Sequence, residues 1–232
     1  MTRHPLRYPA MVTSYVLLGC CVLAGVRVTA TADTDPVVAA RAADDVSVLL
    51  LVSLIIAIGS GYTLLAALVH PVGKSSAVTV RRVRQQRGLR SRSWVEIDDG
   101  ERSRWMPVYF DPVLVTVPSP TPATLVRTGI RPLVRIDGHR LFAAGKLRER
   151  EPAGTLIDNP ARADPQSRER GAQVARLPRR LILDAQFALP APIIGGLWVY
   201  LRGGGVLTFA LSCLVAAGVG IWLAAIAGSD PS

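Results

Sequence analysis

Histidine and cysteine are scarce in this chain, and their scarcity excludes several kinds of chemistry. Only three histidines (His4, His70 and His139) and three cysteines occur among 232 residues. No serine or cysteine motif accompanies a histidine, as nucleophilic catalysis requires, and the cysteines show no metal-ligand spacing. The glycine run at 203–205 lacks the strand-loop-helix setting of a phosphate loop. We therefore expect no enzymatic activity, no metal ion and no cofactor.

Lysine is nearly absent as well. Lys74 and Lys146 are the only lysines, although the chain holds 27 basic residues and carries a formal net charge of +10. Abundant arginine with abundant alanine is typical of a GC-rich genome, so part of the arginine excess reflects codon usage. A hydrophobic content of 50% is high for so basic a chain. The apolar and basic residues therefore occupy separate segments, as in a protein that combines membrane spans with a basic domain.

Long apolar runs are present, and four of them are expected to form transmembrane helices. Residues 11–31, 46–70 and 206–228 are long enough, at ~1.5 Å per residue, to cross a ~30 Å hydrocarbon core. Residues 181–201 contain two prolines and must bend, so this segment either spans with a kink or is re-entrant. Ionisable residues are absent from the middle of these runs, which argues against a self-sufficient carrier.

The basic residues predict the orientation of the spans. If the N-terminus is cytoplasmic, only Arg27, Arg41 and Arg202 of the 27 basic residues lie on or near the outer side. Residues 1–32 also resemble a cleavable signal peptide, and cleavage would leave the central region on the same side. We expect a multi-pass protein of the bacterial plasma membrane whose N- and C-termini are cytoplasmic.

Residues 93–160 are predicted to form a small all-β domain, either a barrel or a meander. Short runs rich in β-branched and aromatic residues alternate there with turn residues. These runs are 94–97, 106–110, 113–117, 133–136, 139–144 and 155–157. Asp-Gly pairs within 97–102 and 136–139 indicate hairpins. The PSPTPAT stretch at 118–124 is expected to be an extended connection rather than a polyproline ligand.

The predicted fold is a membrane α-helical protein with four transmembrane helices and a small all-β cytoplasmic domain. The predicted order is a cytoplasmic N-terminus (1–10), transmembrane helix 1 (11–31), an extracytoplasmic loop (32–45), transmembrane helix 2 (46–70), a basic juxtamembrane segment (71–92), the β domain (93–160), a flexible polar linker (161–180), transmembrane helix 3 (181–201), an extracytoplasmic turn (202–205), transmembrane helix 4 (206–228) and a cytoplasmic C-terminus (229–232).

The stretch VTVRRVRQQRGLRSR at 78–92 carries six arginines and no acidic residue. Directly after a span it marks the cytoplasmic side, and it is also expected to bind anionic lipid headgroups at about 1 kcal/mol per basic residue. Nucleic-acid binding would need aromatic platforms or base-reading residues, and Trp94 is the only aromatic nearby, so nucleic acid is not an expected partner. The expected anionic-lipid contacts are Lys74, Arg81, Arg82, Arg84, Arg87, Arg90 and Arg92.

Small residues recur at four-residue spacing along two apolar segments. Such faces allow helix backbones to approach closely. The contact can form within one chain or between copies, so a homo-oligomer stays open. The predicted helix-packing residues are Ser53, Ala57, Gly61, Ser212, Ala216, Gly220 and Ala224.

The segment order, with WMPVYFDPVLVTVPSP and GTLIDNPARADP between two pairs of spans, resembles uncharacterised four-span membrane proteins of high-GC Gram-positive bacteria over most of the chain. This resemblance implies no activity. The NfeD-like group is similar in layout only, which does not transfer function. We expect a non-enzymatic scaffold or adaptor that presents its β domain at an anionic membrane surface to a protein partner in the membrane or cytoplasm. The alternatives are an accessory subunit of a transport or envelope-assembly complex and, after it, a membrane-bound enzyme or ligand sensor.

Overall fold

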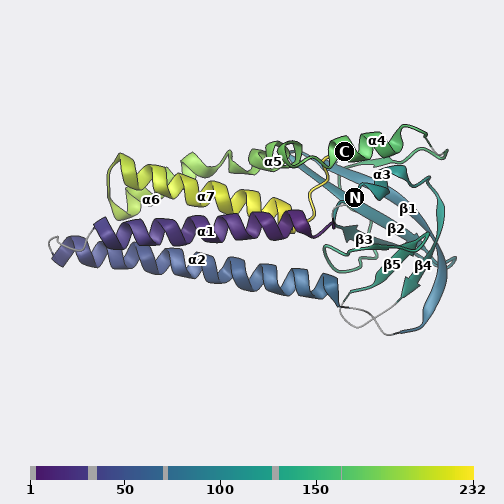
Figure 1. The fold of residues 1–232 in the computed structure, drawn as a ribbon, viewed down its shortest axis with the longest axis horizontal. Helices are drawn as coiled ribbons and strands as arrows, with labels where there is room; N and C mark the ends of the chain where they lie inside the picture. The colour runs from purple at the N-terminus through teal and green to yellow at the C-terminus, as the bar shows by residue number, and fades with distance from the viewer. Residues whose placement is uncertain (1–3, 31–35, 70–72, 127–130, 163) are drawn as a thin grey trace.

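The computed structural model describes residues 4–30, 36–69, 73–126, 131–162 and 164–232. It consists of a bundle of long helices with a β domain at one end, and both ends of the described chain lie at that same end (Figure 1). Three helices are long and apolar enough to cross a membrane, and a bent pair of shorter helices counts as a fourth candidate if it is one span. This mixture of apolar helices and a separate β domain agrees with the coarser part of the predicted fold class.

The first two long helices both begin earlier than expected. Helix α1 covers Arg7–Ala30, and α2 covers Pro36–Leu68, with 33 residues. Residues 36–45 were assigned to an extracytoplasmic loop, but alanine-rich sequence after a proline favours a first helical turn, and they extend α2. At ~1.5 Å per residue, a helix of this length is about 50 Å long, which exceeds a ~30 Å hydrocarbon core.

The third apolar segment is broken, as its prolines predict. It consists of α5 (Leu177–Ala185), the 3₁₀ turn η1 (Gln186–Ala188) and α6 (Ala191–Arg202). The two halves are bent by 42°. The break falls at Pro190, whose ring prevents a continuous helical turn. After a turn at 203–205 the chain enters α7 (Val206–Ile226), so α6 and α7 form the expected hairpin.

A small polar cluster joins α1, α2 and α7 inside the bundle. Trp222 on α7 donates its indole N–H to Ser60 Oγ on α2 at 2.8 Å, and Ser60 Oγ lies 3.0 Å from Thr13 Oγ1 on α1. All three side chains are buried. Buried polar groups that satisfy one another fix the relative rotation of the helices that carry them.

The β domain is a single curled antiparallel sheet of seven strands. The strands are β1 (Ser75–Arg87), β2 (Arg90–Asp98), β3 (Ser103–Val108), β4 (Thr121–Val126), β5 (Leu133–Ile136), β6 (His139–Leu141) and β7 (Thr155–Asp158). Their order is β3-β2-β1-β4-β5-β6, and β7 pairs with β1. The two Asp-Gly turns fall between β2 and β3 and between β5 and β6, as predicted.

The sheet begins at Ser75 and not at residue 93. The stretch predicted to be a basic juxtamembrane segment (71–92) supplies β1 and the start of β2, which pair in register from Thr79 opposite Asp98 to Arg87 opposite Arg90. Gly88 turns the chain with a positive φ of 57°, which glycine adopts without strain. Valine alternates with polar and basic residues in this stretch, which is typical of a strand. The high charge led us to interpret the stretch as a basic segment instead.

The open edge of the sheet is covered by the chain that follows β6. Tyr109 N donates to Phe142 O at 2.9 Å, Ala144 N donates to Pro107 O at 2.8 Å, and Trp105 and Arg148 exchange backbone hydrogen bonds. The sheet therefore encloses an apolar core. Its central members are Val80, Val95, Met106, Val108, Leu125 and Val134.

Two predictions around the sheet are wrong. Residues 113–117 were expected to form a strand, but Asp111 Oδ1 accepts a hydrogen bond from Val113 N at 3.0 Å and starts a short helix, α3 (Val113–Thr116). Residues 161–180 were expected to be a flexible linker, but they contain α4 (Ser167–Val174) and the start of α5. Gly171 allows α4 to rest against the backbone of Pro112, since an added Cβ would lie 2.9 Å from Pro112 O.

Candidate functional site

The C-terminal tail, residues 227–232, joins the helix bundle to the β domain. Ser229 forms a backbone bridge with Arg92 of β2, and Asp230 N donates to Ser91 O at 3.0 Å. Residues 229–232 were predicted only as a cytoplasmic C-terminus, and in the structure Ser229, Asp230 and Pro231 are buried. The end of α7 is therefore attached directly to the strand that carries part of the basic run.

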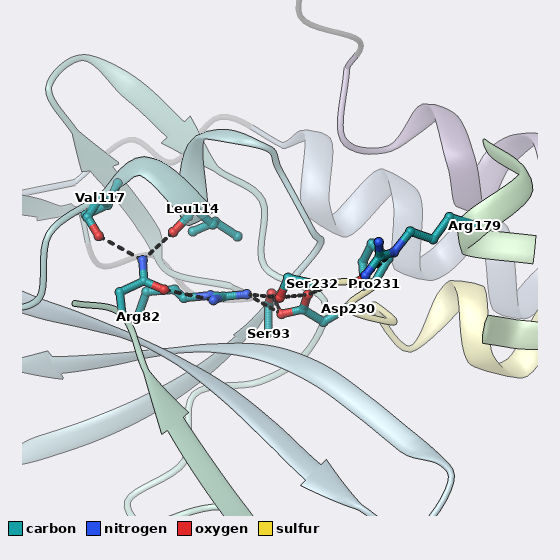
Figure 2. Close-up of polar contacts among 9 residues, drawn as sticks. Arg82, Ser93, Leu114, Val117, Arg179, Asp230, Pro231 and Ser232 are labelled. Atoms are coloured by element: carbon teal, nitrogen blue, oxygen red, sulfur yellow. Dashed lines mark hydrogen bonds and ion pairs between the residues drawn. The ribbon is translucent and has the colours of Figure 1, made fainter. Parts of the chain in front are cut away.

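A buried ion pair lies at the centre of this attachment (Figure 2). The Arg82 guanidinium contacts Asp230 Oδ2 at 2.6 Å, and the exposed fractions of the two side chains are 6% and 0%. Ser93 donates its hydroxyl to the same carboxylate oxygen at 2.5 Å. Ser232 N donates to the other oxygen at 2.9 Å. A buried carboxylate with this many donors is held in one orientation.

Asn159 extends the network into the domain. Its Nδ2 donates to Leu114 O at 2.6 Å and to Val117 O at 2.8 Å, while its Oδ1 accepts from Arg82 Nη1 at 2.8 Å. The carbonyls belong to the turn around α3. A continuous hydrogen-bonded path therefore runs from α3 through Arg82 to the C-terminal tail.

The charges in this network shift the pKa of Asp230. Burial alone would raise that pKa, but the Arg82 guanidinium and the hydrogen bonds from Ser232 and Ser93 hold it below its ordinary value. The ionised form of Asp230 is therefore the form that the folded protein favours.

Arginines of the sheet also satisfy the carbonyls at the ends of two long helices. Arg92 donates from Nε to Ala227 O at 2.8 Å, just past α7, and a second nitrogen of its guanidinium contacts the same oxygen. Arg140 on β6 donates to Ala67 O at 2.7 Å and to Val69 O at 2.9 Å, at the end of α2. The last carbonyls of a helix lack partners within the helix and carry partial negative charge, which a cation stabilises.

Burial has a measurable consequence for Arg92. It lowers the pKa of Arg92 to about 10, and the nearby charges of Arg90 and Arg148 act in the same direction. Arg92 nevertheless stays charged at neutral pH and remains a cation beside the end of α7.

The tail also contacts the helices on its other side. Ser229 donates its hydroxyl to Asp184 Oδ2 on α5 at 3.0 Å, and Tyr8 on α1 donates to the same oxygen at 2.5 Å. Arg179 Nε donates to Pro231 O at 3.2 Å (Figure 2). The tail therefore contacts α5 and the sheet directly, and Asp184 connects it to α1 through Tyr8.

The structure divides the seven predicted lipid contacts into three groups. Arg82 is buried and Arg92 is half-buried, and they face the tail and the end of α7. Their protein partners correct their prediction as lipid contacts. Arg81 contacts Glu96 at 2.7 Å and Asp158 at 3.2 Å on the sheet. Of the other four, Arg84 is half-buried, and three are exposed: Lys74, Arg87 and Arg90.

The tip of the β1–β2 hairpin lies beside the bent third segment. A cavity of about 280 Å³ is lined there by Arg90 and Arg92 together with Phe187, Pro190 and the small-residue side of α7. Leu89 at the tip is 51% exposed. An exposed leucine flanked by arginines at the end of a helix bundle is a composition suited to a lipid headgroup layer.

The predicted helix-packing residues also divide into two groups. On α7, Gly220 lies against the backbone of Phe187, Ala224 is buried, and Ala216 lines the cavity beside the β1–β2 hairpin tip. Ser212 donates its hydroxyl to Thr208 O of its own helix at 2.8 Å.

On α2 the predicted face is not the one that the chain uses. Ala57 is exposed, and Ser53 donates its hydroxyl to Leu49 O of its own helix. Apart from the adjacent backbone of α2 itself, no described atom lies within 4 Å of a Cβ added at Gly61. The neighbouring Gly59 instead faces Trp222, since a Cβ added at Gly59 would lie 3.4 Å from the Trp222 ring. The choice between two adjacent faces depends on where α1 and α7 lie, which helical spacing alone does not reveal.

Sequence reasoning missed Asn159, Asp184 and Asp230. Asn159 stands before Pro160 just after the last predicted strand run, where an Asn-Pro pair is typical of a turn and gives no sign of a buried role. Asp184 and Asp230 are acidic residues directly beside apolar segments, on the side that is otherwise rich in arginine. That placement was the available signal, because an acidic residue near many basic ones is expected to pair.

Within the described ranges, no group of three or more histidine, cysteine, aspartate or glutamate side chains is arranged to hold a metal ion. Comparison of the chain with protein-family models, curated proteins and solved structures found no match. The residues themselves therefore carry the functional conclusion.

Proposed function

We propose that this chain is a multi-pass protein of the bacterial plasma membrane that holds its β domain in a fixed position against the anionic cytoplasmic headgroup layer. In this role it is a non-enzymatic scaffold or adaptor, and it presents the outer surface of the domain to a protein partner. The observation that carries the proposal is the buried Arg82–Asp230 pair, which ties the end of α7 to β1.

A flexible tether would suffice if the domain only needed to be near the membrane. Instead, the last carbonyls of α2 and of the α7 end accept hydrogen bonds from arginines of the sheet. The tail also contacts Asp184 of α5, which Tyr8 of α1 contacts in turn. Several simultaneous contacts limit domain motion far more than a single linker does, because each contact must break before the domain can rotate. The arrangement suits a surface that must be presented at a set angle.

The hairpin tip supports the membrane-surface part of the proposal. Arg87 and Arg90 are exposed and flank Leu89. Basic residues close to an anionic surface contribute about 1 kcal/mol each, and this attraction weakens as salt screens it.

Hydrogen exchange of the full chain in nanodiscs tests the hairpin contact. Segment 84–92 should exchange more slowly in discs containing phosphatidylglycerol than in discs of phosphatidylcholine alone, and added salt should reduce the difference. Arg90→Gln should weaken this protection about fivefold, given ~1 kcal/mol per basic residue. Arg102→Gln, just past the other end of β2, is the matched control and should leave it unchanged. Equal exchange in both kinds of disc would contradict the lipid contact.

Membrane sidedness needs a separate experiment. Glu101→Cys, at an exposed turn, should react with an impermeant maleimide only after cells are opened, in a background whose three native cysteines are serines. Labelling of intact cells would place the domain outside.

Copurification of a partner at fixed stoichiometry in mild detergent would favour the accessory-subunit alternative over a free adaptor.

A further inference from the structure

A second cavity lies where the helix bundle meets the β domain, and its lining differs from that of the cavity beside the β1–β2 hairpin tip. Its volume is about 670 Å³, and it lies between the start of α1, the α4–α5 connection and the segment before α3. This volume falls within the ~300–1,000 Å³ typical of small-molecule sites.

The charge of this cavity has one sign. Four arginines line it, Arg7, Arg168, Arg176 and Arg180, and His4 lies at its edge. The lining that the structure describes includes no aspartate or glutamate. Like charges gathered around one space repel one another, so a bound anion would relieve the repulsion.

Arg180 is the buried member of this set. Its exposed fraction is 6%, and its guanidinium lies over the Tyr8 ring, with its carbon 3.8 Å from the ring centroid. Its Nε and Nη2 have no hydrogen-bond partner among the residues that the structure describes. In the neighbouring carboxylate of Asp184, Oδ2 accepts from Tyr8 and Ser229, and Oδ1 has no hydrogen-bond partner among the described residues. Buried donors without partners are costly, so a ligand that accepts hydrogen bonds here would be stabilised.

The apolar part of the lining indicates what else the ligand carries. Met11, Leu177 and Pro178 line the cavity beside the arginines. Leu177 begins the bent pair of helices and Met11 lies in the first turns of α1, so the cavity is level with the ends of candidate spans. In a bilayer this level holds lipid headgroups and the first carbons of their chains.

We propose that this cavity binds one anionic phospholipid, with its phosphate group on Arg180, Arg176 and Arg7 and its glycerol and upper acyl carbons against Met11 and Leu177. The planar guanidinium of arginine pairs with phosphate oxygens through two parallel hydrogen bonds. The inference rests on the proposed membrane location. It concerns a single bound lipid and not the general attraction of the hairpin tip.

Native mass spectrometry of the full chain in a nonionic detergent tests the site. Phosphatidylglycerol, phosphatidylcholine and free glycerol 3-phosphate are added in turn as probes. The pair Arg7→Gln/Arg176→Gln removes two exposed arginines from the lining and is compared with Arg162→Gln/Arg170→Gln, which makes the same charge change outside it. Arg180→Gln is a third variant. Thermal unfolding verifies that each variant is folded.

The wild-type chain should retain one phosphatidylglycerol and hold it more tightly than phosphatidylcholine. Arg7→Gln/Arg176→Gln should weaken retention about tenfold or more, as expected for two basic contacts with an anionic headgroup. The control pair should retain the lipid as the wild type does. Equal weakening by both pairs would overturn the proposal, since it would show unspecific charge attraction.

Glycerol 3-phosphate binding as tightly as the lipid would also overturn it and identify a soluble phosphate compound as the ligand. Hydrogen exchange of segment 84–92 in nanodiscs is a separate measurement. If the lipid adduct is not observed but this segment is still protected, the lipid site alone is refuted. If the protection is also absent, the membrane-surface role is refuted as well.

Discussion

The two ends of the helix bundle are stabilised by different kinds of interaction. At the domain end, Arg82 and Asp230 form a buried ion pair surrounded by further hydrogen bonds. At the far end, Arg27 contacts Asp45 at 3.1 Å and Arg202 contacts Asp44 at 2.9 Å, and these side chains are between 21% and 63% exposed. Large apolar side chains there, such as Tyr200 and Val206, are each 85% exposed.

The contrast shows where orientation is specified. Exposed ion pairs contribute ~0–1 kcal/mol and leave their partners free to rearrange. Breaking a buried pair by removing one partner costs ~3–5 kcal/mol, because the remaining charge stays desolvated. The fold therefore fixes the helices relative to the sheet at one end, while the other end relies on weak pairs and on apolar surface suited to lipid.

Removing the carboxylate at the domain end should have the largest effect. Asp230→Ala leaves the buried Arg82 without its partner and should lower the free energy of unfolding by about 3–5 kcal/mol. Asp44→Ala, which removes the exposed pair at the far end, should change it by about 0–1 kcal/mol. Thermal unfolding of both variants in mild detergent measures the difference, and similar losses would show that the two ends do not differ.

A bulky residue on the small-residue side of α7 should have a smaller effect. Gly220→Ile places a side chain against the backbone of Phe187 and should cost about 1–3 kcal/mol through overpacking. Gly61→Ile makes the same chemical change on α2 where a Cβ has open space, so it should be tolerated. Melting temperatures that fall equally would mean that helix propensity and not packing explains the loss.

Acidification should loosen the domain end with the smallest effect, because a neutral carboxyl keeps part of its hydrogen bonding. The pKa of Asp230 in the folded chain lies below its unfolded value, so its contribution to stability is complete above that unfolded value of about 4 and is lost as the pH falls through the folded pKa. Limited proteolysis of the tail across this range measures the loss. Asp230→Asn should remove the pH dependence; an unchanged profile would assign it to another group.

Much of the fold could be predicted from local sequence. Apolar length gives the candidate spans, proline gives the break in the third segment, and Asp-Gly pairs give two hairpins. Errors arose where a local pattern had two physical solutions. The stretch around Arg82 fits either a basic tether or a strand. Val113–Thr116 has the composition of a strand, but Asp111 accepts a hydrogen bond from Val113 N and the chain turns into a short helix. Long-range strand pairing selected the first outcome and a local side-chain hydrogen bond favoured the second.

The sequence by itself determined that this chain combines apolar helices with a β domain, and on which side of those helices its arginines gather. Only the tertiary structure decided what individual arginines do. Arg82 and Asp230 are 148 residues apart, so no local pattern links them. Arg82 binds a carboxylate, and Arg92 binds a carbonyl at the end of a helix. Arg87 is exposed to solvent. The physical reason is desolvation: a guanidinium buried by packing requires a partner within reach, whereas an exposed one is satisfied by water.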